Sequence, residues 1–152
     1  MNNSRETKEI EVCTYDIADV EEGMSVHYTV LLARESVNAF AELSGDISPL
    51  HVDEGFGKNT PFGSNLVHGM LIASHFSSLV GVFLPGRNAL LAGMDVSFIK
   101  PVPVGSEITV SAAVRSIQRS SRMIGLRLLA FLDGEVCVEG SAKVKILPPQ
   151  SA

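Results

Sequence analysis

Several residue types are scarce in this sequence of 152 residues. It has no tryptophan and only two tyrosines, so seven phenylalanines and many aliphatic residues must supply the core. It has 12 lysines and arginines against 17 aspartates and glutamates, and the resulting net charge of −5 disfavours a nucleic-acid partner. The two cysteines, Cys13 and Cys137, stand in no CxxC or Cys/His spacing, which predicts reduced thiols and no zinc framework.

Several motifs are also missing. The chain contains no GxGxxG and no GxxxxGK[ST], so the sequence gives no support for a nucleotide cofactor. It has no GxSxG either, the usual setting of a nucleophilic serine. No basic segment followed by an apolar run opens the chain, which predicts a cytoplasmic protein. The apolar stretch 66–84 contains two histidines and three serines, so we interpret it as a buried helix and expect no membrane association.

Length and apolar content predict one α+β domain over residues 10–147, with flexible ends at 1–9 and 148–152. Alternating apolar residues predict strands, and Asp133-Gly134 is a hairpin signal between the last two. Helical periodicity predicts helices at 35–44 and 66–83, with a loop between them that includes a helical turn near 53–58. The predicted strands are 24–32, 89–99, 107–115, 123–132 and 135–146. The expected fold is an antiparallel sheet of about five strands around one long helix.

The predicted long helix has apolar side chains nearly all round, which predicts that it is covered on most sides. Gly69, Ala73, Ser77 and Gly81 recur every four residues along it. Such a stripe of small residues predicts close approach of the helix to the sheet.

The loop SGDISPLHVD (44–53) carries the polar residues of most interest. An aspartate and an imidazole that point into one cavity can hold a water between them, one taking its proton while the other donates one. Asp46 and His51 are therefore candidate catalytic residues. The alternative is structural, with Asp46 capping a turn and His51 bonded within the loop.

Other polar residues have both functional and structural interpretations. Gly69 lies where helix N–H groups have no intrahelical partner, so it can bind an oxygen that gains negative charge, or simply be small. His68 and His75, with His51 and Asp53, suggest a metal site, but packing histidines are favoured and we predict no metal. Four arginines cluster in the back half, where they are solvated or meet phosphates of a carrier: Arg115, Arg119, Arg122 and Arg127.

Three segments together are more specific than any single motif. FAELSGDISPLHVD (40–53), FGSNLVHGMLIASHFSSLVGVFLPG (62–86) and VSFIKPVPVGSEITV (96–110) resemble the MaoC-like dehydratases, and among them the (R)-specific enoyl-CoA hydratases. The resemblance covers roughly residues 24–147. It implies a hot-dog fold, a homodimer, an acyl-CoA substrate and (R)-specific hydration of trans-2-enoyl-CoA without a cofactor.

The resemblance also implies roles for individual residues. The family's catalytic Asp and His fall on Asp46 and His51, its oxyanion-binding N–H on Gly69, and a supporting helix serine on Ser77. One position departs, since Ser48 stands where the family usually has Asn, and the orientation of the site loop or its water is affected. Two alternatives stay open: a hot-dog acyl-CoA thioesterase and a non-catalytic acyl-thioester-binding subunit.

Overall fold

The computed structural model describes residues 10–151, so the predicted flexible segment 1–9 lies outside the described residues. Residues 148–151 are exposed and have no regular secondary structure. The main elements, in chain order, are β1 (Ser25–Leu31), α1 (Arg34–Ser44), α2 (Pro49–Val52), α3 (Glu54–Lys58), α4 (Gly69–Ser78), a π-helical turn (Leu79–Phe83), β2 (Ala89–Phe98), β3 (Glu107–Gln118), β4 (Met123–Leu132) and β5 (Glu135–Ile146).

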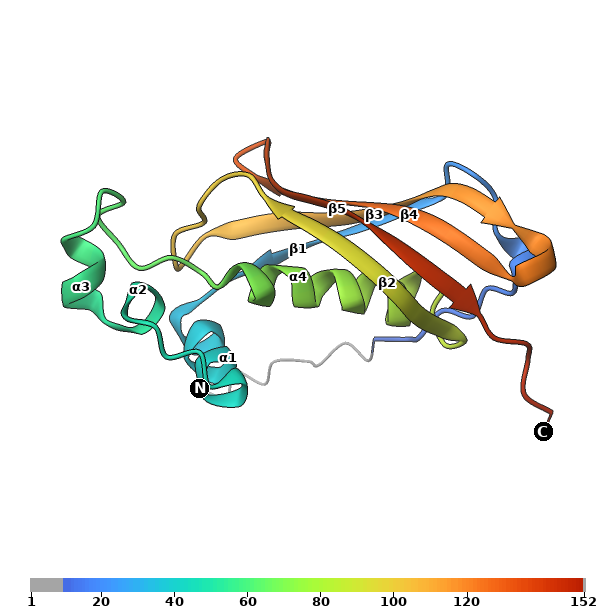
Figure 1. The fold of residues 1–152 in the computed structure, drawn as a ribbon, viewed down its shortest axis with the longest axis horizontal. Coiled ribbons are helices and arrows are strands. Elements are labelled where there is room, and N and C mark those ends of the chain that lie inside the picture. Colours follow the sequence, from blue (N-terminus) through green and yellow to red (C-terminus); the bar gives the residue numbers. More distant parts are fainter. Residues whose placement is uncertain (1–9, 152) are drawn as a thin grey trace, which may run out of the picture.

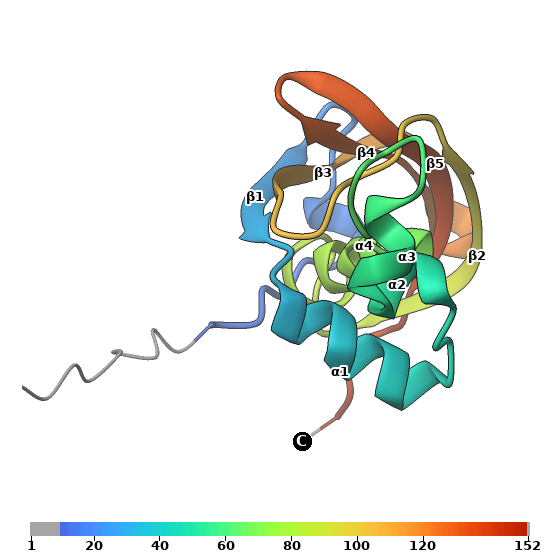
Figure 2. The ribbon, with the colours of Figure 1, turned by 90° about the vertical axis from the view of Figure 1, so that its left-hand side faces the viewer.

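The five strands form one antiparallel sheet in the order β1-β3-β4-β5-β2. The sheet curves around α4, which lies along its concave face (Figures 1 and 2). The other helices, α1, α2 and α3, gather at one end of α4 (Figure 1). The predicted α+β architecture, about five antiparallel strands around a central helix, is confirmed.

Alternation places one face of each central strand in the core. In β3, Ile108 and Val110 are buried, as are Ala112 and Val114 farther along the strand. They pack in the same cluster as Phe76 of α4, which is fully buried. The predicted hairpin is also present, because Asp133 and Gly134 both have positive φ values between β4 and β5.

The long helix differs from its prediction at both ends. Residues 66–68 are not helical, because the N–H groups of Leu66 and Val67 donate to the carbonyls of Leu50 and Val102. These bonds pin the chain to α2 and to the segment before β3, so α4 begins only at Gly69. The regular α-helix ends at Ser78 and continues as the π-helical turn.

One side of α4 is open, which contradicts the prediction that it is covered on most sides. Met70 is 63% exposed, and Ser77 and Gly81 are exposed as well. The prediction that the small-residue stripe meets the sheet is therefore wrong for Ser77 and Gly81. Ala73 is buried in the core cluster, and Gly69 is in tight contact, since a Cβ there would lie 2.6 Å from the Phe98 ring. Within residues 10–151, no helix combines the length and apolar character needed to cross a membrane.

Candidate active site

The turn after α1 aims the Asp46 carboxylate. Gly45 ends the helix in the left-handed conformation, with its N–H bonded to the Ala41 carbonyl. The Asp46 N–H then donates to the Ser44 hydroxyl, and Asp46 Oδ1 accepts the Ser48 N–H. One carboxylate oxygen thus has the turn-capping role that the structural interpretation assigned to it. The other, Oδ2, is free to face His51.

His51 lies on α2, a short helix within the segment predicted to be a loop. Its Nδ1–H donates to the Leu66 carbonyl at 2.8 Å. Because Nδ1–H is bonded to the Leu66 carbonyl, Nε2 is the ring nitrogen left to exchange a proton at the site, with a lone pair in the neutral ring and an N–H in the protonated one. Nε2 is 3.9 Å from Asp46 Oδ2, too far for a direct hydrogen bond but close enough for one water to contact both. The structure therefore brings the two predicted catalytic residues together.

Ser48, the position that departs from the family pattern, is the N-cap of α2. Its carbonyl accepts the N–H groups of His51 and Val52, while its side chain caps no helix N–H. Pro49 follows at the first helical position, where a missing N–H has no cost. Main-chain atoms of Ser48 thus support the helix that carries His51.

Two polar residues, the buried Asn65 and the half-buried Arg34, hold α2 in place. Asn65 is 3% exposed, and its Nδ2 donates to the carbonyls of Pro49, Leu50 and Asp53. Its Oδ1 accepts a bond of 2.7 Å from Arg34, whose guanidinium also donates to the His51 carbonyl. The main chain on both sides of His51 is therefore fixed.

His51 and Gly69 line the same pocket, of about 350 Å³. Gly69 is the first residue of α4, where the N–H has no intrahelical partner, and the Phe98 ring packs directly against it. At the rim, Lys100 forms an ion pair with Glu135. The other lining residues are mainly apolar: Leu50, Leu66, Val67, Met70, Ile72, Phe98, Ile99, Pro101, Val102 and Val138. A mainly apolar pocket with few polar groups is typical of a site for an apolar substrate.

Ser77 is not brought into this pocket. It is exposed and lies two turns beyond Gly69 on α4, about 12 Å along the helix axis. Its predicted supporting role stays a prediction.

The cluster of Asp46, His51 and His68 does not fit a metal ion, although their ligand atoms lie within 4.8 Å of one another. The two imidazole rings are stacked, with centroids 3.9 Å apart and planes 25° from parallel. Lone pairs of ring nitrogens lie in the ring planes, so stacked rings cannot both direct one at an ion about 2.1 Å away. The other residues of the metal hypothesis are engaged elsewhere, since Asp53 caps α3 and His75 Nδ1 is 2.9 Å from the Tyr28 hydroxyl.

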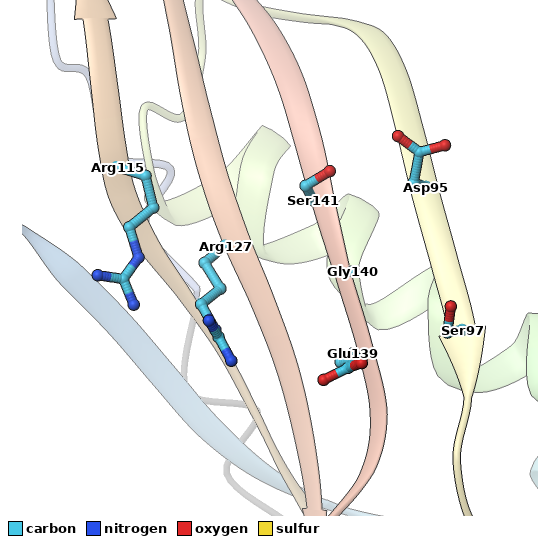
Figure 3. Close-up of a pocket in the computed structure, with 7 residues that line it drawn as sticks. All are labelled: Asp95, Ser97, Arg115, Arg127, Glu139, Gly140 and Ser141. Atoms are coloured by element: carbon cyan, nitrogen blue, oxygen red, sulfur yellow. The ribbon is translucent and has the colours of Figure 1, made fainter.

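The four arginines do not form one anion site. Arg119 and Arg122 bind backbone carbonyls, and Arg122 also pairs with Asp16. Arg115 and Arg127 stand on the outer face of the sheet, away from α4 (Figure 3). The carboxylates of Asp95 and Glu139 share that hollow and offset their charge, which fits the interpretation of a solvated sheet face.

Sequence reasoning missed the supporting roles of Arg34, Asn65 and His68. Asn65 and His68 lie in the four residues directly before α4, and both are buried. Polar residues in an apolar run such as LVHGML were a signal that buried hydrogen bonds form there. The sequence does not reveal their partners, which lie 12 to 31 positions away.

The comparisons with known proteins agree with this geometry. Residues 7–127 match the family described as MaoC like domain. The chain belongs to the MaoC-like family. An (R)-specific enoyl-CoA hydratase of Aeromonas caviae is 38% identical over 84% of this chain and 96% of its own length. A 3-hydroxybutyryl-CoA dehydratase of Methylorubrum extorquens is 31% identical over 88% and 85%.

Solved structures of MaoC-like relatives share the hot-dog fold. The A. caviae (R)-hydratase involved in PHA biosynthesis superimposes with a TM-score of 0.82 and 37% identity, over 84% of this chain and 98% of that one. R-hydratase PhaJ1 from Pseudomonas aeruginosa superimposes with a TM-score of 0.85 and 27% identity, over 93% and 98%. The fold class implied by the family resemblance is thereby confirmed.

Proposed function

We propose that this chain catalyses the (R)-specific hydration of trans-2-enoyl-CoA to (R)-3-hydroxyacyl-CoA, and the reverse dehydration. The observation that carries the proposal is the Asp46–His51 pair beside an apolar pocket, with a gap that accommodates one water. The named relatives are hydratases and dehydratases of such thioesters, which supports the same substrate class here.

In the proposed reaction, Asp46 is the base and His51, protonated at Nε2, is the acid. The Asp46 carboxylate takes a proton from the bridging water, and the water oxygen forms a bond to C3 of the enoyl group. The C2–C3 π-electron pair passes to C2, which receives the proton from His51 Nε2. The proton on Asp46 then returns to His51, and the pair is ready for another cycle.

The thioester oxygen gains negative charge while the bond at C3 forms. Gly69 lines the same pocket as His51, and its N–H, which has no intrahelical partner, can donate to that oxygen. Loss of one such donor typically lowers the rate by about 10²–10³-fold. The supporting role of Ser77 stays a prediction, since Ser77 does not line this pocket. Addition of water changes no net oxidation state, so the reaction requires no redox cofactor.

The experiment is an absorbance assay for loss of the enoyl-thioester chromophore, using crotonyl-CoA and octenoyl-CoA. Chiral analysis of the product and a parallel assay for free CoA accompany it. The proposal predicts an (R)-3-hydroxyacyl-CoA product. Release of free CoA instead would identify a thioesterase, and binding of both thioesters without turnover would identify a binding subunit.

Two variants test the assigned residues. We expect Asp46→Asn and His51→Gln to lower kcat by about 10²–10⁴-fold, the usual contribution of a positioned acid or base. Asp95→Asn and His27→Gln are matched controls, since both side chains are exposed and Asp95 lies on the outer sheet face. Near-normal turnover of both site variants would refute the assignment.

We further propose that the enzyme is a homodimer. Strand β2 is a sheet edge, and it leaves large apolar side chains exposed, among them Leu90 (51%) and Phe98 (52%). Because Phe98 also lines the pocket, a second copy on this edge would cover the substrate site. Light scattering is expected to give twice the chain mass of 16.2 kDa, and Leu90→Lys to give the monomer.

We propose a cytoplasmic location and a single domain over residues 10–147. Cys13 and Cys137 are both free thiols, which is the usual state in a reducing compartment. Cell fractionation tests the location. Limited proteolysis tests the domain, with trimming of the ends and no internal cut as the expected pattern.

A further inference from the structure

His68 joins the parts of the proposed site, although neither its own role nor its partners follow from the sequence. It is 1% exposed and occupies the N-cap of α4, directly before Gly69. Its carbonyl accepts the N–H groups of Leu71 and Ile72, and the neighbouring Val67 N–H donates to the Val102 carbonyl. The backbone of His68 is therefore fixed by the first turn of α4 and by the chain before β3.

The imidazole of His68 reaches from this fixed point to both members of the acid–base pair. Its Nε2–H donates to the Asp46 carbonyl at 2.9 Å. One face of the ring stacks on His51 with centroids 3.9 Å apart, and the Phe40 ring meets it edge-on at 4.9 Å. The other bonds of the Asp46 turn are local, to Ser44 and Ser48, so the His68 bond ties this turn to α4.

Packing alone does not account for a histidine at this position. Nε2 carries the hydrogen, so Nδ1 is a bare acceptor, and within residues 10–151 it is the buried side-chain atom left without a partner. A buried acceptor without a partner costs free energy, and a phenyl ring of similar shape would avoid that cost. The histidine therefore contributes something a phenyl ring lacks, namely the bond to Asp46.

We propose that His68 is a positioning residue that sets the distance between Asp46 Oδ2 and His51 Nε2. This inference rests on the proposed function. The N–H bond holds the Asp46 turn, and the stacked face limits the tilt of the His51 ring. Because Gly69 follows His68 in the chain, the same residue also fixes the oxyanion donor relative to the acid–base pair.

Three substitutions separate the two contacts. His68→Phe keeps a ring against His51 but removes the donor. His68→Gln places an amide N–H near the position of Nε2 and removes the ring, whereas His68→Asn has an N–H that falls short of it. Exposed His27→Gln is the control for histidine loss.

We expect His68→Phe and His68→Asn to lower kcat on crotonyl-CoA by about 10²-fold, the cost of a displacement of about 1 Å in a reacting pair. KM stays within about twofold, since substrate contacts are unchanged, and the pH profile of kcat/KM shifts because the pair separates. His68→Gln recovers kcat to within about fivefold of the unsubstituted enzyme. If His68→Phe does not fold, the comparison of His68→Asn with His68→Gln carries the test.

Two results would overturn the inference. One is a kcat within about threefold of the unsubstituted enzyme for folded His68→Phe or His68→Asn. The other is a parallel loss of kcat, KM and thermal stability in all three variants with an unchanged pH profile, which indicates a purely structural role. An unsubstituted enzyme with no hydratase activity is a different result, because it refutes the proposed function itself.

Discussion

Replacement of Asn65 by alanine tests how the fold supports α2. The change removes an amide whose two N–H groups are shared among the carbonyls of Pro49, Leu50 and Asp53. It also leaves the Arg34 guanidinium without one acceptor. At about 1 kcal/mol for each of the two N–H groups and about 1.5–3 kcal/mol for the charge-assisted bond to Arg34, the free energy of unfolding should fall by about 4 kcal/mol.

Urea denaturation at neutral pH measures this loss for Asn65→Ala. The matched control is Asn59→Ala, because Asn59 is exposed and its amide makes one bond, to the Gly55 carbonyl. We expect the control to lose about 1 kcal/mol or less. Equal losses in the two variants would refute the argument, since they would mean that water replaces the buried amide at no cost.

Three further predictions concern single positions. Burial lowers the pKa of His75 below its ordinary value of 6.5. As pH falls below that value, the unfolded chain gains the His75 proton before the folded chain does. The folded state therefore loses stability as the pH falls. The drop in Tm from pH 7.5 to 5.5 should be smaller in His75→Gln than in the unsubstituted protein. An equal drop in both would refute the lowered pKa of His75. Gly69→Ala places a Cβ 2.6 Å from the half-exposed Phe98 ring. Since the ring can turn into the pocket, Tm should change little while kcat/KM falls, and an unchanged kcat/KM would contradict this. Gly140→Ala places a Cβ 2.2 Å from the Asp95 carbonyl, so backbone must shift. The free energy of unfolding, measured in urea, should fall by about 3 kcal/mol. An unchanged urea midpoint would show that β2 and β5 shift apart at no cost.

The sheet was predictable because its strands are buried on one face. Alternation of apolar residues predicted a strand at 107–115, and Ile108 and Val110 of β3 are buried on its core face. The strand order was not predictable, because pairing of β2 with β5 depends on contacts between distant segments. The predicted start of α4 was too early for a similar reason. The Leu66 N–H donates to the distant Leu50 carbonyl, and this bond keeps Leu66 out of the helix.

The site was predictable only in part. The five-residue spacing of Asp46 and His51 allowed them to meet, and the structure places them 3.9 Å apart. The short helix α2 escaped prediction because four residues carry too little periodicity to detect. Asn65 and His68 escaped because a buried polar residue is interpretable only when its partners are known.

The bond between His51 Nδ1 and the Leu66 carbonyl has an evolutionary consequence. Every amino acid carries a main-chain carbonyl, so no substitution at position 66 removes this acceptor. The Leu66 side chain, in contrast, lines the pocket, so its size affects the space for substrate. One residue thus holds Nδ1–H of His51 through its backbone while its side chain shapes the pocket. A substitution at position 66 can therefore change the substrate range while the hydrogen bond that orients His51 is kept.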